Sequence, residues 1–258
     1  MAEAEPYSAF ATVYDGAGYT RFSQNMIGII QGIMARQKVT PHRLLDLACG
    51  TGVAAVAFAR LGYEVVGVDR SEAMLAHARA RADGVPITFL CQDMRDLALP
   101  QPVDLAICLF DSLNYLLEPG DLLRAFHRVA ETLTPGGLFL FDMNTRYGLA
   151  ERWGTVQRVQ ADTEDFFLVG KTEFDYEADI AILTLTGFVR EGETFRRFTE
   201  VHGERAYPLA TIEAGLREAG LSVLEIHGLM TPTPGAALQL EPPHRETGRV
   251  LFLAQRPA

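Results

Sequence analysis

Residues 44–52, which read Leu-Leu-Asp-Leu-Ala-Cys-Gly-Thr-Gly, decide the fold. The apolar run 44–48 predicts a buried parallel strand, and the apolar segment 53–59 that follows it predicts a helix. Gly50 and Gly52 join the two, and a side chain at either position would block a ligand that approaches the bare backbone. The free N–H groups of the first helical turn point at such a ligand. The stretch predicts a binding loop, and a tight turn without a ligand is the alternative.

Strand-like and helical segments alternate on both sides of this loop. The sequence predicts helices at 22–37, 53–59, 71–82 and 120–133, and further strands at 64–69, 87–91, 103–110 and 138–142. This alternation is typical of an open, mostly parallel sheet, whose ligands bind beyond the carboxyl ends of the strands. An acidic residue stands at each of those ends: Asp46, Asp69, Asp93, Asp111 and Asp142. We expect these carboxylates to converge on one edge.

Composition narrows the functional class. The 258 residues are 48% hydrophobic and carry a formal charge of −10 without a Lys/Arg-rich run, so nucleic acid is a disfavoured partner. No apolar run is long enough to span a membrane, and the acidic N-terminus lacks the apolar region of a signal peptide. The three cysteines stand in or beside apolar runs without metal-ligand spacing, which predicts buried thiols in a cytoplasmic protein and no metal site.

Two segments depart from the alternation. Residues 6–22 are rich in aromatic side chains, which predicts either a flap over the binding edge or packing onto the domain. Residues 145–206 predict an antiparallel insertion with strands at 166–175, 180–190 and 194–207. The last of these strands alternates in polarity: one face carries Arg196, Phe198, Glu200, His202 and Glu204, and the other carries Arg197, Val201, Arg205 and Tyr207.

The alternating pattern returns after residue 207. A helix at 209–219 and strands at 222–228 and 249–254 are predicted, separated by the proline-rich segment 231–248. Such a long connection is uncommon in a compact domain. We expect it to be a mobile surface or oligomer-contact loop rather than a catalytic one. Its turn is expected opposite the ligand-binding strand ends or along the sheet edge.

Several motifs resemble those of the class I S-adenosylmethionine-dependent methyltransferases. They are residues 46–52, 66–69 with 71–75, 91–94 and 133–137, in that order along the chain. With the insertion motif 197–202, the chain is most similar to a bacterial small-molecule branch that includes deoxyamino-sugar N,N-dimethyltransferases. The resemblance implies a Rossmann-like α/β fold with a mostly parallel seven-stranded sheet, an antiparallel last strand and an antiparallel β insertion. The expected units are 1–144 with the cofactor-binding half, 145–206 covering the acceptor, and 207–258 completing the sheet.

The resemblance also implies a cofactor site. Asp69 is suited to accept both ribose hydroxyls, Asp93 to accept the adenine amine, and Met74 or Met94 to pack against the adenine ring. The pattern Gly50-x-Gly52-x-x-Ala55 also fits a dinucleotide, but no Lys or Arg lies in 44–59 to balance a pyrophosphate, whereas a cationic sulfonium suits an acidic cleft. The expected S-adenosylmethionine-binding residues are Asp46, Ala48, Cys49, Gly50, Gly52, Asp69, Arg70, Met74, Asp93, Met94, Leu109 and Tyr19.

The acceptor is expected to be a small molecule with a nitrogen or oxygen nucleophile. Residues 110–115 replace the motif that methyltransferases of nucleic-acid bases carry at this place, which disfavours bases as substrates. The predicted acceptor contacts are Asp111, Asn114, Tyr115 and Arg197, and the predicted catalytic residues are His202, as a base, and Tyr14. The alternatives are a noncatalytic S-adenosylmethionine-binding module and a nicotinamide-dependent oxidoreductase. The sequence is compatible with a monomer or a homodimer.

Overall fold

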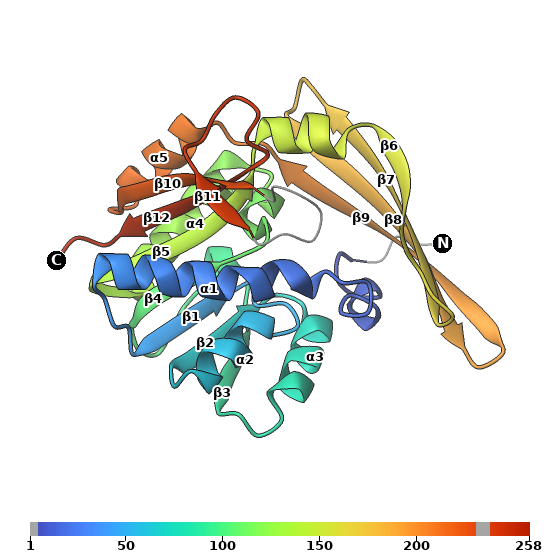
Figure 1. Cartoon of the computed structure of the whole chain (residues 1–258), viewed down its shortest axis with the longest axis horizontal. Helices are drawn as coiled ribbons and strands as arrows, with labels where there is room; N and C mark the ends of the chain where they lie inside the picture. Colours follow the sequence, from blue (N-terminus) through green and yellow to red (C-terminus); the bar gives the residue numbers. More distant parts are fainter. Residues whose placement is uncertain (1–4, 231–237) are drawn as a thin grey trace.

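The computed structural model describes residues 5–230 and 238–258, and its larger sheet is built around the strand that ends at the glycine loop. The strand order of this sheet is β11-β10-β12-β5-β4-β1-β2-β3 (Figure 1). The last five strands of this order are parallel to one another, and β12 is antiparallel to its neighbour β5. The parallel strands are β1 (Arg43–Leu47), β2 (Glu64–Asp69), β3 (Ile87–Cys91), β4 (Val103–Cys108) and β5 (Leu133–Asn144). The others are β10 (Ser222–Met230), β11 (Gln239–Glu241) and β12 (Arg249–Gln255).

Helices cover both faces of this sheet, because consecutive side chains of a strand point to opposite faces. Leu44 packs with Met26 of α1 and Phe58 of α2, whereas its neighbour Leu45 packs with Phe126 of α4 on the other face. The bounds of the helices are α1 Thr20–Gln37, α2 Val53–Arg60, α3 Glu72–Ala82, α4 Pro119–Thr132 and α5 Leu209–Glu218. The predicted α/β fold with a mostly parallel sheet is confirmed.

A separate four-stranded antiparallel sheet projects from one side of the domain (Figure 1). It consists of β6 (Val156–Asp162), β7 (Phe166–Asp175), β8 (Ile180–Glu191) and β9 (Thr194–Arg205), after the π-helical turn η4 (Gly148–Trp153). β6 was absent from the sequence prediction because it is a largely exposed edge strand with few apolar residues. The predicted alternation of β9 is confirmed from Phe198 to Glu204, where alternate side chains are buried.

The connection between β10 and β12 differs from its prediction. Residues 231–237 of the expected loop lie outside the described residues, but the remainder includes β11, an eighth strand that pairs with β10. β12 is antiparallel to both β10 and β5, and Arg249 pairs with Asn144 at the carboxyl end of β5. The connection therefore reaches β12 at the edge where the parallel strands end. The expected position opposite that edge was wrong because β10 runs in the same direction as β5.

Two smaller expectations have different outcomes. Cys49 and Cys108 are buried, but Cys91 is exposed because it ends β3, the edge strand of the sheet. Within the part of the chain that the structure describes, no helix has the length and apolar character needed to cross a membrane.

Candidate functional site

The glycine loop leaves β1 in a conformation that suits glycine. Gly50 and Gly52 have φ of +55° and +76°, in the left-handed region that side chains disfavour. A Cβ at Gly52 would lie 2.9 Å from the Cβ of Ala78, so this glycine also permits close packing of α3. A Cβ at Gly50 would lie 3.3 Å from Met74 Cε, which faces the same cavity. Gly50 is thus the position that keeps the backbone open, and Gly52 serves the local packing.

A first cavity, partly open to solvent, lies above this loop at the carboxyl ends of the parallel strands. The predicted cofactor-binding residues line it, except Gly52, which packs behind the loop, and Tyr19. Tyr14 lines it as well. Tyr7, Thr20 and Ser23 also line it but were missed, although the aromatic character of residues 6–22 indicated a flap.

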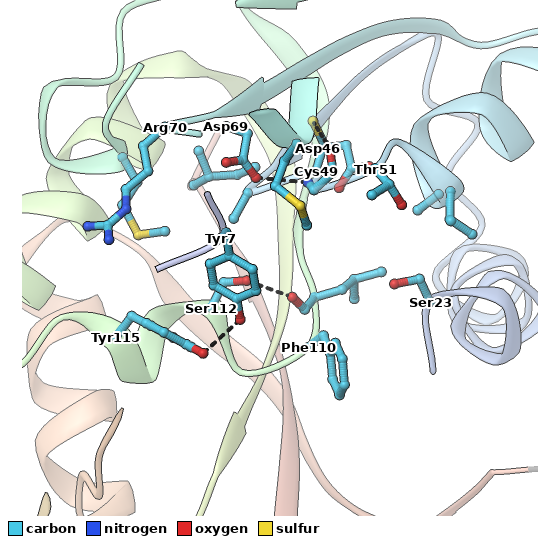
Figure 2. A pocket seen from close by; sticks show the side chains of 18 of the residues that line it. Tyr7, Ser23, Asp46, Cys49, Thr51, Asp69, Arg70, Phe110, Ser112 and Tyr115 are labelled. Atoms are coloured by element: carbon cyan, nitrogen blue, oxygen red, sulfur yellow. Dashed lines mark hydrogen bonds between the residues drawn. The ribbon is translucent and has the colours of Figure 1, made fainter. Parts of the chain in front are cut away.

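Asp69 holds the glycine loop at the end of β2 (Figure 2). Its carboxylate accepts hydrogen bonds from the backbone N–H groups of Gly50 and Ser71, both at 2.8 Å. Burial raises the pKa of Asp69, and these two N–H donors limit the rise. The carboxylate also faces the first cavity, where it can accept hydroxyl donors from a ligand.

Asp46 is the second acid of this cavity and lacks a partner for one oxygen. It is 2% exposed, and its Oδ2 has no hydrogen bond within the described residues. Burial raises its pKa to about 7, and the Asp69 carboxylate adds to the rise. A buried acid without a partner is costly unless a donor or cation meets it. Together with the open backbone at Gly50, this acid fits a cofactor that carries positive charge, as S-adenosylmethionine does.

Asp93, the residue expected to bind adenine, is already engaged. Its two oxygens accept hydrogen bonds from Arg95 at 2.9 and 2.8 Å, and Arg95 also pairs with Asp121. The hydrogen bonds from Arg95 lower the pKa of Asp93. Asp93 still lines the first cavity, so an adenine amine would have to share this carboxylate with Arg95.

The N-terminal segment, residues 5–19, closes one side of the first cavity. Ser71 Oγ donates to the Tyr7 carbonyl at 2.8 Å, and Thr51 Oγ1 donates to Asp15 at 2.7 Å. Phe10 and Val13 of the same segment are buried against the insertion. Both predictions for these aromatic residues are therefore correct in part: some line the cavity and others pack onto the protein.

A second cavity lies between the first and the insertion, and Tyr7, Phe110 and Tyr115 line both. Of the predicted acceptor and catalytic residues, Asp111, Tyr115 and His202 line the second cavity, as does Tyr19. Two predicted contacts are absent from its lining. Arg197 is exposed on the other face of β9, and Asn114 is fully buried, with its amide bound to backbone groups of Asn144 and Arg205.

His202 connects the cavity wall to the interior of the insertion. Its side chain is 2% exposed, its Nδ1 lies 3.1 Å from the Tyr115 hydroxyl, and its Nε2 lies 3.3 Å from Glu200 Oε2. The Nε2 contact lacks good hydrogen-bond geometry. Figure 2 shows the hydroxyls of Tyr115 and Tyr7 pointing toward one another, 2.7 Å apart.

A cluster of charged side chains lies beside the second cavity, and Asp111, Glu204 and Arg249 of this cluster line it. Arg249, at the start of β12, pairs with Asp111 at 2.7 Å and with Asp142, and its guanidinium lies over the Phe110 ring. Asn144 Nδ2 bridges Asp111 and Glu204 at 2.5 and 2.8 Å. Burial raises the pKa of Glu204 well above its usual range, and Asp111 raises it further. Neither Arg249 nor Glu204 was among the predicted site residues; the polarity of β9 was a signal for Glu204, whereas Arg249 reaches this place only through the pairing of β12 with β5.

Comparisons with known proteins agree with this geometry. A methyltransferase domain family matches residues 44–137. The putative methyltransferase YqeM of Bacillus subtilis is 31% identical over 97% of both chains. The Streptomyces venezuelae dTDP-3-amino-3,4,6-trideoxy-alpha-D-glucopyranose N,N-dimethyltransferase is 31% identical over 72% of this chain and 77% of its own.

Solved structures show the same relationship. An S-adenosylmethionine-dependent methyltransferase from Clostridium acetobutylicum is 28% identical, with a TM-score of 0.83 over 98% of this chain and 99% of its own. These similarities favour a methyltransferase over a nicotinamide-dependent oxidoreductase or a noncatalytic module.

Proposed function

Because the chain belongs to the class I S-adenosylmethionine-dependent methyltransferases, in the branch that includes deoxyamino-sugar N,N-dimethyltransferases, we propose that it methylates a nitrogen or oxygen of a small molecule in the second cavity. One observation carries this proposal: Tyr7, Phe110 and Tyr115 line both cavities. An acceptor in the second cavity would therefore meet the cofactor at this shared wall.

The cofactor is S-adenosylmethionine, and the residues of the first cavity fit it. In this proposal Asp69 binds the ribose hydroxyls, the carboxylate of Asp46 faces positive charge, and the backbone at Gly50 allows close approach. When bound, the cofactor supplies a methyl group activated by a sulfonium. Tyr14 lines only the first of the two cavities, so any part it takes in catalysis lies on the cofactor side.

The insertion supplies most of the positioning. Trp153, Thr172 and His202 line the second cavity from three parts of the chain near or within the smaller sheet. Holding a nucleophile in line with the methyl group can account for about 7–11 kcal/mol of the barrier. Asp111 and Tyr115 are the proposed acceptor contacts, and His202 is the proposed base.

An amine is the better supported nucleophile of the two. The Streptomyces venezuelae relative is named for two methylations of an amino sugar, and it aligns with 72% of this chain. The second cavity combines the acidic side chain of Asp111 with the aromatic rings of Tyr7, Phe110 and Tyr115, an environment that suits a cationic amine before it loses its proton.

Turnover of methyl-labelled S-adenosylmethionine against a bacterial metabolite extract, followed by mass spectrometry, tests the function. We expect a labelled small molecule with wild-type protein and much less of it with Asp69→Ala at low cofactor concentration, because that variant should bind the cofactor more weakly. Binding of S-adenosylhomocysteine without a labelled product from any fraction, including pooled amines and phenols, would contradict the proposal.

A further inference from the structure

A continuous chain of polar contacts runs from the wall shared by the two cavities into the insertion. The Tyr7 and Tyr115 hydroxyls are 2.7 Å apart (Figure 2). The Tyr115 hydroxyl in turn lies 3.1 Å from His202 Nδ1. His202 Nε2 then faces Glu200 Oε2 at 3.3 Å. Tyr7 comes from the N-terminal segment, Tyr115 from the turn after β4, and the other two from β9. Three separate parts of the chain thus meet in one linear arrangement.

The inner end of this chain, Glu200, also holds the N-terminal segment. Its carboxylate is 0% exposed and accepts the backbone N–H of Tyr7 at 2.7 Å, of Ala9 at 2.7 Å and of Phe10 at 2.9 Å. Ser8 Oγ also lies 3.3 Å from this carboxylate, although its hydroxyl is closer to the Glu5 carbonyl, at 2.6 Å. The carboxylate that faces His202 is therefore the same one that fixes the backbone carrying Tyr7.

The chemistry of the four groups gives the chain a direction. Burial opposes ionisation of Glu200, but the neighbouring His202 side chain and the hydrogen bonds from the Phe10 and Tyr7 amides outweigh it and lower the pKa of the carboxyl. Because a carboxylate can only accept, an imidazole N–H is favoured at Nε2, which faces Glu200, and the lone pair then lies at Nδ1. Tyr115 then donates to Nδ1 and Tyr7 donates to Tyr115. The oxygen of Tyr7 remains able to accept a proton from the cavity.

The surrounding charges keep both tyrosines protonated. Burial raises the pKa of Tyr7 and of Tyr115 well above the usual range, and the carboxylate of Asp111 adds to both rises. Glu204 also acts on Tyr115, while Arg249 pairs with Asp111 from the far side. Because a phenolate is disfavoured here, each hydroxyl must pass one proton on as it receives another.

We propose that Tyr7, Tyr115 and His202 form a proton relay from the acceptor, and that Glu200 orients His202. Because Glu200 also holds the N-terminal segment, the relay is complete only when this segment covers the cofactor cavity. This inference rests on the proposed function and assigns roles to Tyr7, Tyr115 and Glu200 within it. Tyr7 and Tyr115 are catalytic residues in this scheme, because they line the shared wall. Glu200 is a positioning residue.

The step balances without a further reagent. The lone pair of the acceptor atom forms the bond to the methyl carbon while the electrons of the S–CH₃ bond return to sulfur. The acceptor proton passes to Tyr7, the Tyr7 proton to Tyr115, and the Tyr115 proton to His202 Nδ1. The imidazolium that forms is stabilised by the Glu200 carboxylate and later releases its proton to water.

Nitrogen NMR of histidine-labelled protein bound to S-adenosylhomocysteine tests the arrangement without an acceptor. We expect His202 to show a protonated Nε2 and an accepting Nδ1, with the Nδ1 resonance shifted in Tyr115→Phe and unchanged in Tyr63→Phe. Tyr63 lines neither cavity and is a matched loss of one phenol oxygen. A proton on Nδ1 in the wild-type protein would overturn the relay.

Hydrogen exchange and calorimetry test the double role of Glu200. Glu200→Ala should speed amide exchange at Tyr7, Ala9 and Phe10 and weaken S-adenosylhomocysteine binding, whereas Glu225→Ala on β10 should do neither. Glu200→Gln keeps the size of the side chain and serves if Glu200→Ala fails to fold. It should retain cofactor binding within about threefold and lose the wild-type His202 resonances. Unchanged exchange and unchanged resonances in both variants would refute the role.

Steady-state kinetics with the acceptor found in the labelling screen then tests Tyr115 and Tyr7 separately. General-base assistance typically contributes about 10²–10⁴-fold, so Tyr115→Phe and Tyr7→Phe should each lower kcat at least about tenfold, with S-adenosylhomocysteine affinity within about twofold. Wild-type kcat in both variants would overturn the relay even if methyl transfer is established. Absence of any acceptor would instead count against the proposed function, and the NMR result would still decide the arrangement.

Discussion

The two cavities are built in different ways. The first is lined largely by residues at the ends of β1 to β4, each a short distance along the chain from the strand that positions it. The second takes alternate residues of β9, a residue from the start of β12 and residues of the N-terminal segment. The first is held by contacts between neighbouring strand ends, such as the Gly50–Asp69 hydrogen bond across 19 positions, whereas the second depends on pairing over longer separations, such as the 138 positions between Arg249 and Asp111. We therefore expect mutations in the second to affect folding more than those in the first.

The largest effect is expected at Arg249, which lines the second cavity and pairs with the two buried acids Asp111 and Asp142. Arg249→Met leaves Asp111 and Asp142 without their cation, and removing one partner of a buried ion pair typically costs about 3–5 kcal/mol. Urea unfolding at pH 7 should show this loss. Arg36→Met, which breaks an exposed pair with Glu225, should cost less than about 1 kcal/mol. Equal effects of the two variants would erase the difference between the cavities.

The next effect concerns Asp46 in the first cavity and depends on pH. Its folded pKa of about 7 lies above the unfolded value of about 3.9, so the stability from the protonated form is present at low pH and lost as pH rises through this window. Asp46→Asn should remove this loss. Relative to wild type, the free energy of unfolding of the variant should therefore increase by roughly 2–4 kcal/mol as the pH rises from 4 to 7. If the free energies of unfolding of the two proteins, measured without ligand, changed with pH in the same way, this result would contradict the raised pKa.

The pH dependence of stability is expected to have the opposite sign for Asp104→Asn. Backbone N–H donors of Arg43 and His42 overcome the effect of burial and lower the pKa of Asp104. Its stabilising contribution is therefore present at neutral pH and lost as pH falls through its folded pKa. The asparagine variant should be destabilised at pH 7 and approach wild type in acid.

A smaller effect on cofactor binding is expected at Asp69, whose replacement also frees the Gly50 and Ser71 amides. Asp69→Ala removes charge-assisted hydrogen bonds worth roughly 1.5–3 kcal/mol, which weakens S-adenosylhomocysteine binding about ten- to a hundredfold. Isothermal calorimetry measures this change, with Asp96→Ala as a control because Asp96 forms an exposed pair with Arg124. An affinity equal to wild type would reject the ribose assignment.

The smallest effect is expected at Arg197, on the exposed face of the strand that carries His202. Exposed substitutions usually change stability by no more than about 0.5 kcal/mol, and the Arg197 side chain lines neither cavity. Arg197→Ala should therefore leave stability, cofactor affinity and turnover close to wild type. A loss of turnover beyond about fivefold would show that the acceptor extends past the edge of the second cavity.

The sequence by itself determined the elements and the first cavity. Hydrophobic periodicity and turn residues are local properties, so the strand at 43–47, the glycine loop and the strand-end acids Asp46 and Asp69 could be recognised in short windows. The alternation that buries Glu200, His202 and Glu204 on one face of β9 is local as well. A strand such as β6, with few apolar residues, lacked that signal.

Only the tertiary structure decided which distant residues meet. The Tyr7 amide binds Glu200 across 193 positions of sequence, and Arg249 binds Asp111 across 138. It also placed the connection before β12 at the ligand-binding edge, and it buried Asn114 where a free acceptor contact was expected. Such contacts depend on strand order, direction and register, which arise from packing the whole chain and leave no trace in a short window of sequence.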